Sequence, residues 1–381
     1  MVNELHIKCK DGNLGLKLDI SQAFDTVSWS FVLEVFRRYG FSEDWCSWIH
    51  NILKFARISI LLSGSPEGFF KITRGLRQGD PLSLLIFILI EDVLSRNIIK
   101  LFQNKDMTHI GNMKSVRNLV KLLEVYQCAS GQRVCGEKSK IYYGGGSLSR
   151  RQAIDDFLGM SITNFPDRYL GVKVLPGVVK YRHISNVVDK LKEQLSVMKG
   201  KMLSFQNRVV LIKSVFSSYS IHNMAVYKWP VKFIQQCDRA IRNFLWSGDS
   251  NLSRYFVVGY DKICIPVKEG GLGLCSLKTM NQALLMKLWW NIKSSGKNWA
   301  RFLESKFTCR DGRIKVAGVK SSILPGIRWV HNDVVRNNKC IIGDRRSTSL
   351  FFDVWYGVTT LDDVLGRYDL DRGACVSDII Q

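Results

Sequence analysis

The apolar positions of the first fifty residues follow two spacings, and each spacing predicts a different element. Residues 14–20 are mostly apolar and predict a short strand that ends on Asp19. Beyond Ser28 the apolar residues recur every three or four positions as far as Gly40, which predicts an amphipathic helix with Ser28 as its N-cap. Ser42 begins a second pattern of the same kind, so we expect a strand followed by two helices.

Strand and helix signals continue to alternate over the next hundred residues. Alternating positions at 57–62 and at 69–73, separated by a Ser-Gly-Ser-Pro turn, predict an antiparallel hairpin. A long apolar run predicts a helix over 82–99, and a striped pattern with a glycine at its end predicts another over 115–131. A further strand is expected at 138–143. Helices mixed with antiparallel strands indicate the α+β class.

Residues 183–295 have a different character, because helical spacing dominates there and basic residues occupy the outer faces of the expected helices. We therefore expect a basic, mainly helical domain. Beyond residue 296 the pattern weakens into a charged, glycine-rich tail with short strands, such as one at 349–355. The basic residues that we expect to contact nucleic acid are Lys199, Lys201, Arg208 and Lys213.

The balance of charge indicates a polyanionic partner. Lysine and arginine number 55 against 33 aspartates and glutamates, which leaves a net charge of +22. Such an excess favours nucleic acid, because each phosphate that is neutralised releases condensed counterions. Aromatic residues are interleaved with the basic ones, which suits a groove on a folded body. The alternative is charge that only keeps the chain in solution.

The cysteines and the N-terminus limit the possible classes of protein. The ten cysteines form no C-x-x-C pair and no Cys/His spacing, so structural zinc and a disulfide framework are not supported. No signal peptide begins the chain, and the apolar run at 82–90 is too short to cross a bilayer. We expect a nuclear or cytoplasmic protein with reduced thiols and no membrane role. No feature indicates an oligomeric state.

Two short segments carry the residue types that nucleotidyl transfer needs. Asp19 at the end of the expected strand, with the aromatic Phe24 five residues later, places a carboxylate where it can hold a divalent metal. The alternative for Asp19 is a residue that caps the next turn. The second segment, Arg-Gly-Leu-Arg-Gln-Gly-Asp-Pro-Leu-Ser at 74–83, combines glycines that allow close backbone approach with the amide of Gln78 and a helix-opening proline.

These two segments resemble motifs A and B of reverse transcriptases, in particular those of the non-LTR (LINE-type) retrotransposons of plants. The resemblance implies RNA-directed DNA synthesis with Mg²⁺, an RNA template and a DNA primer. It implies that Asp19 is the catalytic metal ligand, and that Ile20 and Phe24 contact the nucleotide, with Phe24 as a steric gate. Gln78 and Gly79 would complete the nucleotide site. A core aromatic is the alternative role for Phe24.

Further segments extend the resemblance over most of the chain. Lys138 lies in a segment that resembles motif D, where a lysine approaches the triphosphate; a solvated surface lysine is the alternative. Tyr169, Leu170 and Gly171 resemble motif E, the primer grip. The implied fold is a reverse-transcriptase palm with partial fingers at 1–175, a basic helical thumb at 176–295 and a connector or tail at 296–381.

One motif of the family is missing. The family carries a strand-turn-strand with aromatic-Ala-Asp-Asp, motif C, where Ile110 of this chain is joined directly to Gly111. The metal site is therefore incomplete, and we predict a catalytically defective, internally deleted fragment of a larger polyprotein. Three alternatives stay open: a non-catalytic module that binds RNA or DNA, a retroelement relic without function, and a gene model that has lost the hairpin as a false intron.

Overall fold

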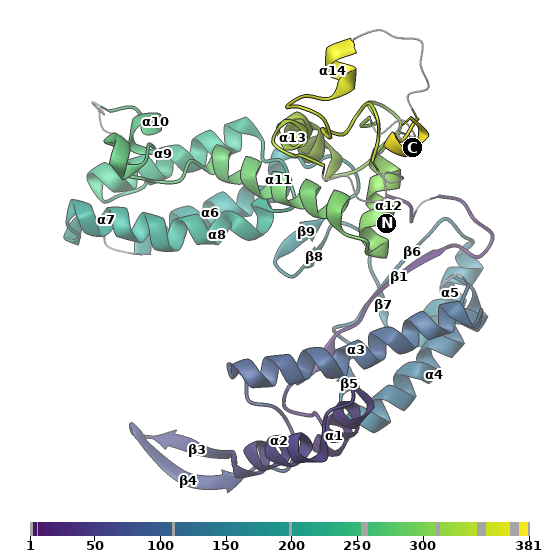
Figure 1. Cartoon of the computed structure of the whole chain (residues 1–381). Coiled ribbons are helices and arrows are strands. Elements are labelled where there is room, and N and C mark those ends of the chain that lie inside the picture. Colours follow the sequence, from purple (N-terminus) through teal and green to yellow (C-terminus); the bar gives the residue numbers. More distant parts are fainter. Residues whose placement is uncertain are drawn as a thin grey trace. The chain divides into compact units, whose positions relative to one another are not determined.

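The computed structural model describes residues 3–5, 7–108, 111–197, 200–252, 258–309, 313–340, 348–365 and 373–379. The chain folds into two compact units, one from Asn3 to Asn164 and one from Phe165 to Gln381 (Figure 1). Each unit has hydrophobic cores of its own. No helix in the described ranges is both long enough and apolar enough to cross a membrane.

The first unit combines five helices with short strands among the residues described. Its helices are α1 (Trp29–Arg38), α2 (Glu43–Phe55), α3 (Pro81–Gln103), α4 (Met113–Ser130) and α5 (Leu148–Leu158). Its strands are β1 (Asn13–Lys17), β2 (Ile20–Ser21), β3 (Arg57–Leu62), β4 (Ser65–Lys71), β5 (Arg133–Val134), β6 (Lys140–Gly144) and β7 (Ser161–Ile162). The predicted mixture of helices and antiparallel strands is confirmed here.

Local caps place the helix ends where the sequence predicts them. The hydroxyl of Ser28 accepts from the amide of Phe31 at 3.5 Å, and the hydroxyl of Ser42 accepts from the amide of Trp45 at 3.2 Å. Helix α4 ends at Gly131, which adopts a left-handed conformation with φ 78°. These signals act over three or four residues, so the sequence alone is sufficient to locate them.

The expected strand over 14–20 is wrong in one respect, because it is two strands with different partners. β1 pairs antiparallel with β6, placing Leu16 opposite Ile141, and β7 continues this sheet in the order β1-β6-β7. β2 pairs with β5 instead. The change of partner falls at Asp19, whose amide donates to the Ser139 hydroxyl at 3.0 Å and whose carbonyl accepts from the amide of Cys135 at 2.7 Å.

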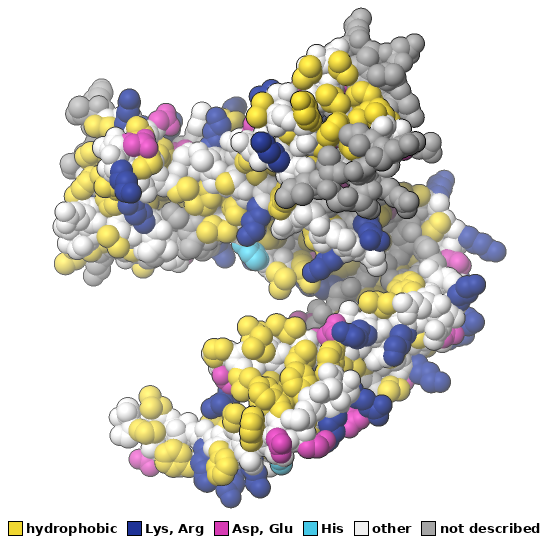
Figure 2. All heavy atoms as spheres, in the orientation of Figure 1, with side chains coloured by type: hydrophobic (Ala, Val, Ile, Leu, Met, Phe, Trp, Pro, Cys, Tyr) yellow, Lys and Arg dark blue, Asp and Glu magenta, His cyan; other side chains and the backbone are white. Residues whose placement is uncertain are grey.

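The hairpin β3–β4 closes earlier than expected. Ser63 and Gly64 have φ angles of 50° and 89°, so a two-residue turn joins the strands and β4 begins at Ser65 rather than at residue 69. Apolar side chains are exposed along this hairpin and over the first half of α3, where Leu84, Leu85 and Ile88 are more than half exposed (Figure 2).

Three clusters make up the core of the first unit. The largest joins α1, α2 and α3 through residues such as Phe36, Ile49 and Ile90. The second packs the sheet against α4 and α5, with Ile141 and Ile154 fully buried. The third lies between α3 and α4. This packing positions the loops that follow β2 and precede α3, which carry the candidate site.

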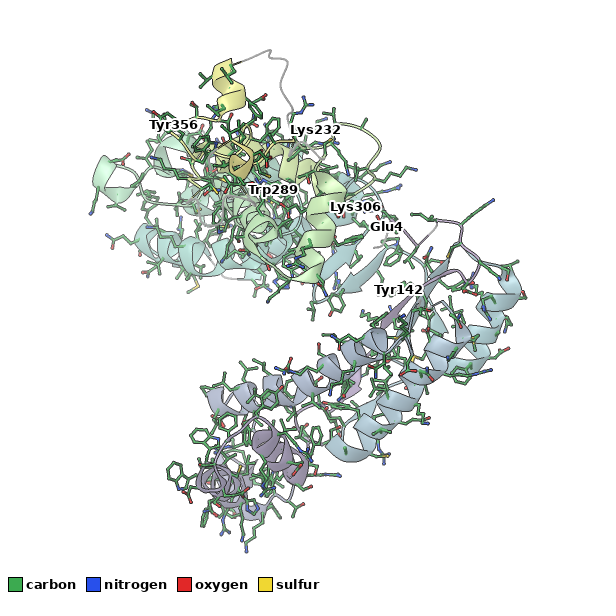
Figure 3. All side chains as sticks on the ribbon, turned by 45° about the vertical axis from the view of Figure 1, so that its right-hand side comes forward. Glu4, Tyr142, Lys232, Trp289, Lys306 and Tyr356 are labelled. Atoms are coloured by element: carbon green, nitrogen blue, oxygen red, sulfur yellow. The ribbon has the colours of Figure 1, made fainter. Side chains whose placement is uncertain are left out.

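The second unit is mainly helical in its described part and begins with a two-stranded hairpin, β8 (Asp167–Tyr169) and β9 (Val172–Val174). One core surrounds Phe233 and Phe244, and a second surrounds Trp289, which is labelled in Figure 3. The α-helices are α6 (Tyr181–Val197), α7 (Phe205–Leu211), α8 (Ser217–Met224), α9 (Val231–Ser247), α10 (Tyr260–Ile263), α11 (Leu277–Ser294), α12 (Asn298–Phe307), α13 (Leu324–Arg336) and α14 (Leu361–Leu365). Shorter turns are a π-helical turn at Ile212–Phe216 and 3₁₀ turns at Gly200–Met202, Val267–Glu269 and Val376–Asp378.

The strand expected at 349–355 is wrong. Ser349 forms only an isolated bridge with Cys375. The amide of Ser349 donates to the carboxylate of Asp353 at 2.8 Å, and the Ser349 hydroxyl accepts from the amide of Phe352 at 3.3 Å. These local side-chain bonds curl the segment into a turn, which competes with strand formation.

Candidate functional site

The centre of the candidate site is the tight turn that follows β2. Gln22 adopts the left-handed region with φ 46°, and its carbonyl accepts from the amides of Asp25 and Thr26 at 2.9 and 3.2 Å. The hydroxyl of Thr26 donates to the same carbonyl at 3.1 Å. The turn therefore has a defined shape that reverses the chain between β2 and α1.

The segment before α3 is bound directly to this turn. The amide of Leu76 donates to the carbonyl of Phe24, the amide of Gly75 donates to the carbonyl of Val27, and the indole of Trp29 donates to the carbonyl of Gly75, each at 2.8 Å. Gly75 has φ 90°, and a Cβ there would lie 2.6 Å from the carbonyl oxygen of Asp25. The close approach of the two segments requires a glycine at this position.

The predicted site residue Gln78 contacts the turn through its side chain. The amide of Gln78 donates to the carboxylate of Asp25 at 3.3 Å, and both side chains are exposed. Gly79 is also exposed, with φ 86° and open space where a Cβ would be. The structure thus places Gln78 and Gly79 beside the turn that contains Phe24.

The ring of Phe24 stacks on Phe87 of α3. Their centroids lie 4.4 Å apart with an interplanar angle of 8°, and Phe24 is half-buried. One face of the ring is therefore occupied by the core of the first unit. The packing role that the sequence left open for Phe24 has direct contacts, and the remaining exposed part is what a nucleotide sugar could reach.

The turn between α4 and β5 holds the same loop from another side. The amide of Ser28 donates to the carbonyl of Ser130 at 2.8 Å, and the side-chain amide of Gln132 donates to the carbonyl of Ala23 at 3.1 Å. A Cβ on Gly131 would lie 2.6 Å from the carbonyl oxygen of Thr26. Two segments that are distant from it in sequence therefore contact the loop 22–28.

Gln132 belongs to a buried polar network that sequence reasoning missed. It is 1% exposed, donates to the carboxylate of Glu91 at 3.0 Å and accepts from the hydroxyl of Tyr126 at 2.8 Å. Burial raises the pKa of Glu91, against the opposing effect of its bonds to Gln132 and Tyr126. The sequence signal was an acid inside the apolar run of α3, whose partner only the fold reveals.

Asp19 lies half-buried between β1 and β2, next to the loop that carries Lys138. Ser139 bonds to the Asp19 amide, while Lys138 itself is exposed. In the described part of the chain, no three His, Cys, Asp or Glu side chains are grouped so that they could hold a metal ion. Mg²⁺ keeps several of its waters and is commonly held by one or two carboxylates together with substrate phosphates, so Asp19 by itself would be a weak site.

Asp80 is the N-cap residue of α3. Its carboxylate accepts from the amide of Leu82 at 3.3 Å and from the hydroxyl of Ser83 at 2.9 Å. The bond from Ser83 is the main cause that lowers the pKa of Asp80, with a further contribution from Arg77, 3.6 Å away. The carboxylate is therefore the N-cap of α3, where its negative charge stabilises the positive end of the helix dipole.

Residues 3–174 match the family described as reverse transcriptase (RNA-dependent DNA polymerase). This part of the chain is a reverse transcriptase domain. The predicted relationship to reverse transcriptases of retroelements is confirmed, because similar proteins belong to retrotransposable elements. The segment with Asp19 and Phe24 and the segment 74–83, which the sequence analysis predicted to be motifs A and B, both lie within the matched residues.

The relatives are distant and much longer than this chain. A putative ribonuclease H protein of Arabidopsis thaliana is 28% identical over 164 residues, covering 39% of this chain and 26% of that protein. The retrovirus-related Pol polyprotein of a type-2 retrotransposable element of Drosophila melanogaster is 22% identical over 313 residues, or 72% of this chain and 28% of that protein. An uncharacterized protein of transposon TX1 from Xenopus laevis is 24% identical over 287 residues, or 69% and 21%. The chain thus spans about a quarter of these relatives.

The match to the reverse transcriptase family continues into the hairpin β8–β9 of the second unit. Tyr169, Leu170 and Gly171, the predicted primer grip, form the tip of this hairpin. Leu170 and Gly171 have φ angles of 47° and 82°, and Tyr169 is 53% exposed. The tip presents side chains to solvent, as a contact with nucleic acid requires.

The basic residues that the sequence grouped together have different surroundings. Lys199 lies outside the described residues. Arg208 donates to the carbonyls of Gly200 at 2.7 Å and of Leu245 and Trp246 at 3.3 Å, so it joins a 3₁₀ turn to the end of α9. Lys201 pairs with Asp249 at 3.6 Å, and Lys213 is exposed.

Proposed function

We propose that this chain is a reverse transcriptase derivative that binds a template and primer but does not extend the primer. The observation that carries the proposal is the set of acidic side chains around Asp19. Two-metal nucleotidyl transfer clamps the attacking and departing oxygens between two ions, and it needs carboxylates from more than one element. Asp19 supplies one carboxylate, and the described residues contain no group of three or more His, Cys, Asp or Glu side chains that could hold a metal ion.

The connection between α3 and α4 supports this proposal. It runs from Asn104 to Asn112, and Met107 within it is 1% exposed and packs in the cluster between the two helices. The amide of Met107 donates to the carbonyl of Leu101 at 2.9 Å, and the side chain of Asn118 donates to the carbonyl of Asp106 at 2.8 Å. In the sequence only residues 104–112 separate the two helices, where the family resemblance calls for motif C. In the described sheet, β6 is the one neighbour of β1.

Several features favour retained binding. Backbone hydrogen bonds join the loop after β2 to the segment before α3, so the surface that these two segments form is rigid enough to bind nucleic acid. The net charge of +22 favours a polyanionic partner. Binding without the metal clamp leaves the transition state without its main electrostatic stabilisation, so affinity for substrates does not restore the rate.

Primer extension tests the catalytic half of the proposal. The purified chain is incubated with poly(rA)/oligo(dT), dTTP and either Mg²⁺ or Mn²⁺, beside an Asp19→Asn variant. We expect no extension from either protein. Extension by the natural chain that disappears in the variant would restore the polymerase assignment. An in-frame Ala-Asp-Asp coding sequence in genomic DNA between the codons for Ile110 and Gly111 would point the same way.

Fluorescence anisotropy tests the binding half. A labelled RNA–DNA duplex is titrated with protein at two salt concentrations, and the affinity is expected to fall steeply as salt rises. The double variant Lys201→Gln/Lys213→Gln should bind more weakly and with a shallower salt dependence. The outcome against the proposal is an affinity that does not change with salt, or no binding at low salt.

A further inference from the structure

The second unit contains a small cavity that is lined by basic and amide side chains. Its volume is about 220 Å³, several times the volume of a water molecule. It is formed by the hairpin β8–β9 with helices α6 and α8, so its walls come from three separate elements. The lining residues used below are Lys173, His183, Asn186, Lys190, His222 and Asn223.

The charge of this cavity is positive. Lys173 and Lys190 line it together with two histidines and Arg168, and no aspartate or glutamate is among its lining residues. The pKa of His183 is lowered first by burial and then by the positive charges of Arg182 and Lys173. Cations that depress the pKa of a neighbouring imidazole are the same cations that attract an anion.

Both ring nitrogens of His183 have a neighbour within hydrogen-bond distance. Its Nδ1 lies 3.0 Å from the backbone amide of Lys180 and accepts that bond, so the ring proton of the neutral imidazole is on Nε2. The Nε–H of Arg182 lies 3.4 Å from this Nε2. The neutral imidazole can then donate one hydrogen bond, from Nε2.

The backbone around the cavity is fixed before any ligand arrives. The hydroxyl of Tyr227, which is 3% exposed, donates to the carbonyl of Lys173 at 2.6 Å and ties β9 to the segment after α8. At the tip of the hairpin, a Cβ on Gly171 would lie 3.9 Å from the ring of His222. The backbone of β9 beside the cavity is therefore held in place, which reduces the entropy lost when a ligand binds.

We propose that this cavity binds a phosphate group. Ammonium, imidazole and carboxamide donors approach it from three elements, an arrangement that suits a tetrahedral oxyanion with acceptors in several directions. The phosphate belongs either to a nucleic-acid backbone or to a small phosphate compound. The first source rests on the nucleic-acid binding proposed above, and the second does not.

Two probes separate these sources. Inorganic phosphate is titrated into the full chain by calorimetry, and a labelled RNA–DNA duplex is titrated by anisotropy. The test variant is Lys173→Gln/Lys190→Gln. The control, Lys232→Gln/Lys287→Gln, removes the same charge from exposed positions on α9 and α11. Thermal unfolding of both variants checks that they are folded.

We expect the test variant to lose about tenfold in phosphate affinity while the control stays within about twofold of the natural chain. A parallel loss of duplex affinity identifies the backbone as the source; an unchanged duplex affinity identifies a small phosphate compound. If the natural chain binds phosphate but no duplex, the proposed function fails and the cavity assignment stands. Absence of phosphate binding by the natural chain, or equal losses in both variants, overturns the assignment.

Discussion

The side-chain amide of Gln132 donates a hydrogen bond of 3.1 Å to the backbone carbonyl of Ala23, 109 positions earlier in the chain. Gln132 is in turn held by Glu91 and Tyr126, so the loop that follows β2 is anchored to α3 and α4 through one buried side chain. This bond adds to the backbone bonds and apolar contacts that keep the loop in its shape. Disrupting it should affect the folded state more than any exposed contact of the same loop.

Replacing Gln132 with leucine should lower the free energy of unfolding by about 2–3 kcal/mol, because the variant leaves buried polar groups of Glu91 and Tyr126 without their partner. Chemical denaturation of the two proteins measures the difference. The control is Gln103→Leu at the exposed end of α3, for which a change below about 0.5 kcal/mol is expected. Equal effects at the two positions would contradict the role given to the network.

Comparing alanine substitutions at Gly75 and Gly79 tests how much the close approach of the two segments contributes to stability. Both have positive φ, but a Cβ would meet the carbonyl of Asp25 at 2.6 Å from Gly75 and nothing within 4 Å from Gly79. Alanine at Gly79 should cost about 1 kcal/mol of stability, and alanine at Gly75 about 2–4 kcal/mol, since only the latter pushes two backbones apart. Denaturation of both variants measures this, and equal losses would show that the close approach is unimportant.

Arg208 should matter for stability and Lys201 for binding. Arg208→Ala removes the donor for three carbonyls, two of them at the end of α9, and should cost about 1–3 kcal/mol. Lys201→Ala removes an exposed ion pair and should change stability by less than about 0.5 kcal/mol. Unfolding and duplex binding are measured for both. A fully stable Arg208→Ala protein would return this residue to the binding surface.

The stability of the second unit should depend on pH through Asp238. Burial raises the pKa of this carboxyl to about 7, and one of its oxygens is buried without a partner among the described residues. The folded state then keeps a proton that the unfolded state loses near pH 4, so stability falls as the pH rises from about 4 through 7. After allowance for relaxation and screening, we expect a contribution of about 1–2 kcal/mol between pH 5 and pH 8.

Asp238→Asn should remove this fall, so the variant gains stability relative to the natural chain at pH 8 but not at pH 5. Exposed Asp189→Asn is the control and should keep the natural pH dependence. Burial lowers the pKa of His331 to about 4, which contributes with the opposite sign between pH 4 and 6.5. The comparison of variants at each pH cancels that contribution. Identical pH profiles for the natural chain and Asp238→Asn would refute the assignment.

The residue types and spacings of the sequence were enough to identify the relationship to reverse transcriptases and most helix boundaries. Ser28 and Ser42 cap their helices and Gly131 ends α4 as predicted, because a cap depends on atoms three or four residues away. The motif around Gln78 was recognisable for a similar reason, since its glycines and proline have local conformational requirements.

Tertiary structure alone decided which partners these elements take. The strand that the sequence suggested up to Asp19 is divided, because its first part pairs with β6 and its last part pairs with β5. The guanidinium of Arg208 donates to a carbonyl at the end of α9, although the sequence placed this residue on a basic outer face. The partners of Gln132 and Phe24 lie on helices distant in sequence. Hydrogen bonds and ring contacts between such residues form only when long stretches of the chain fold back on themselves. The spacing of residues along the chain does not determine which distant segments then come into contact.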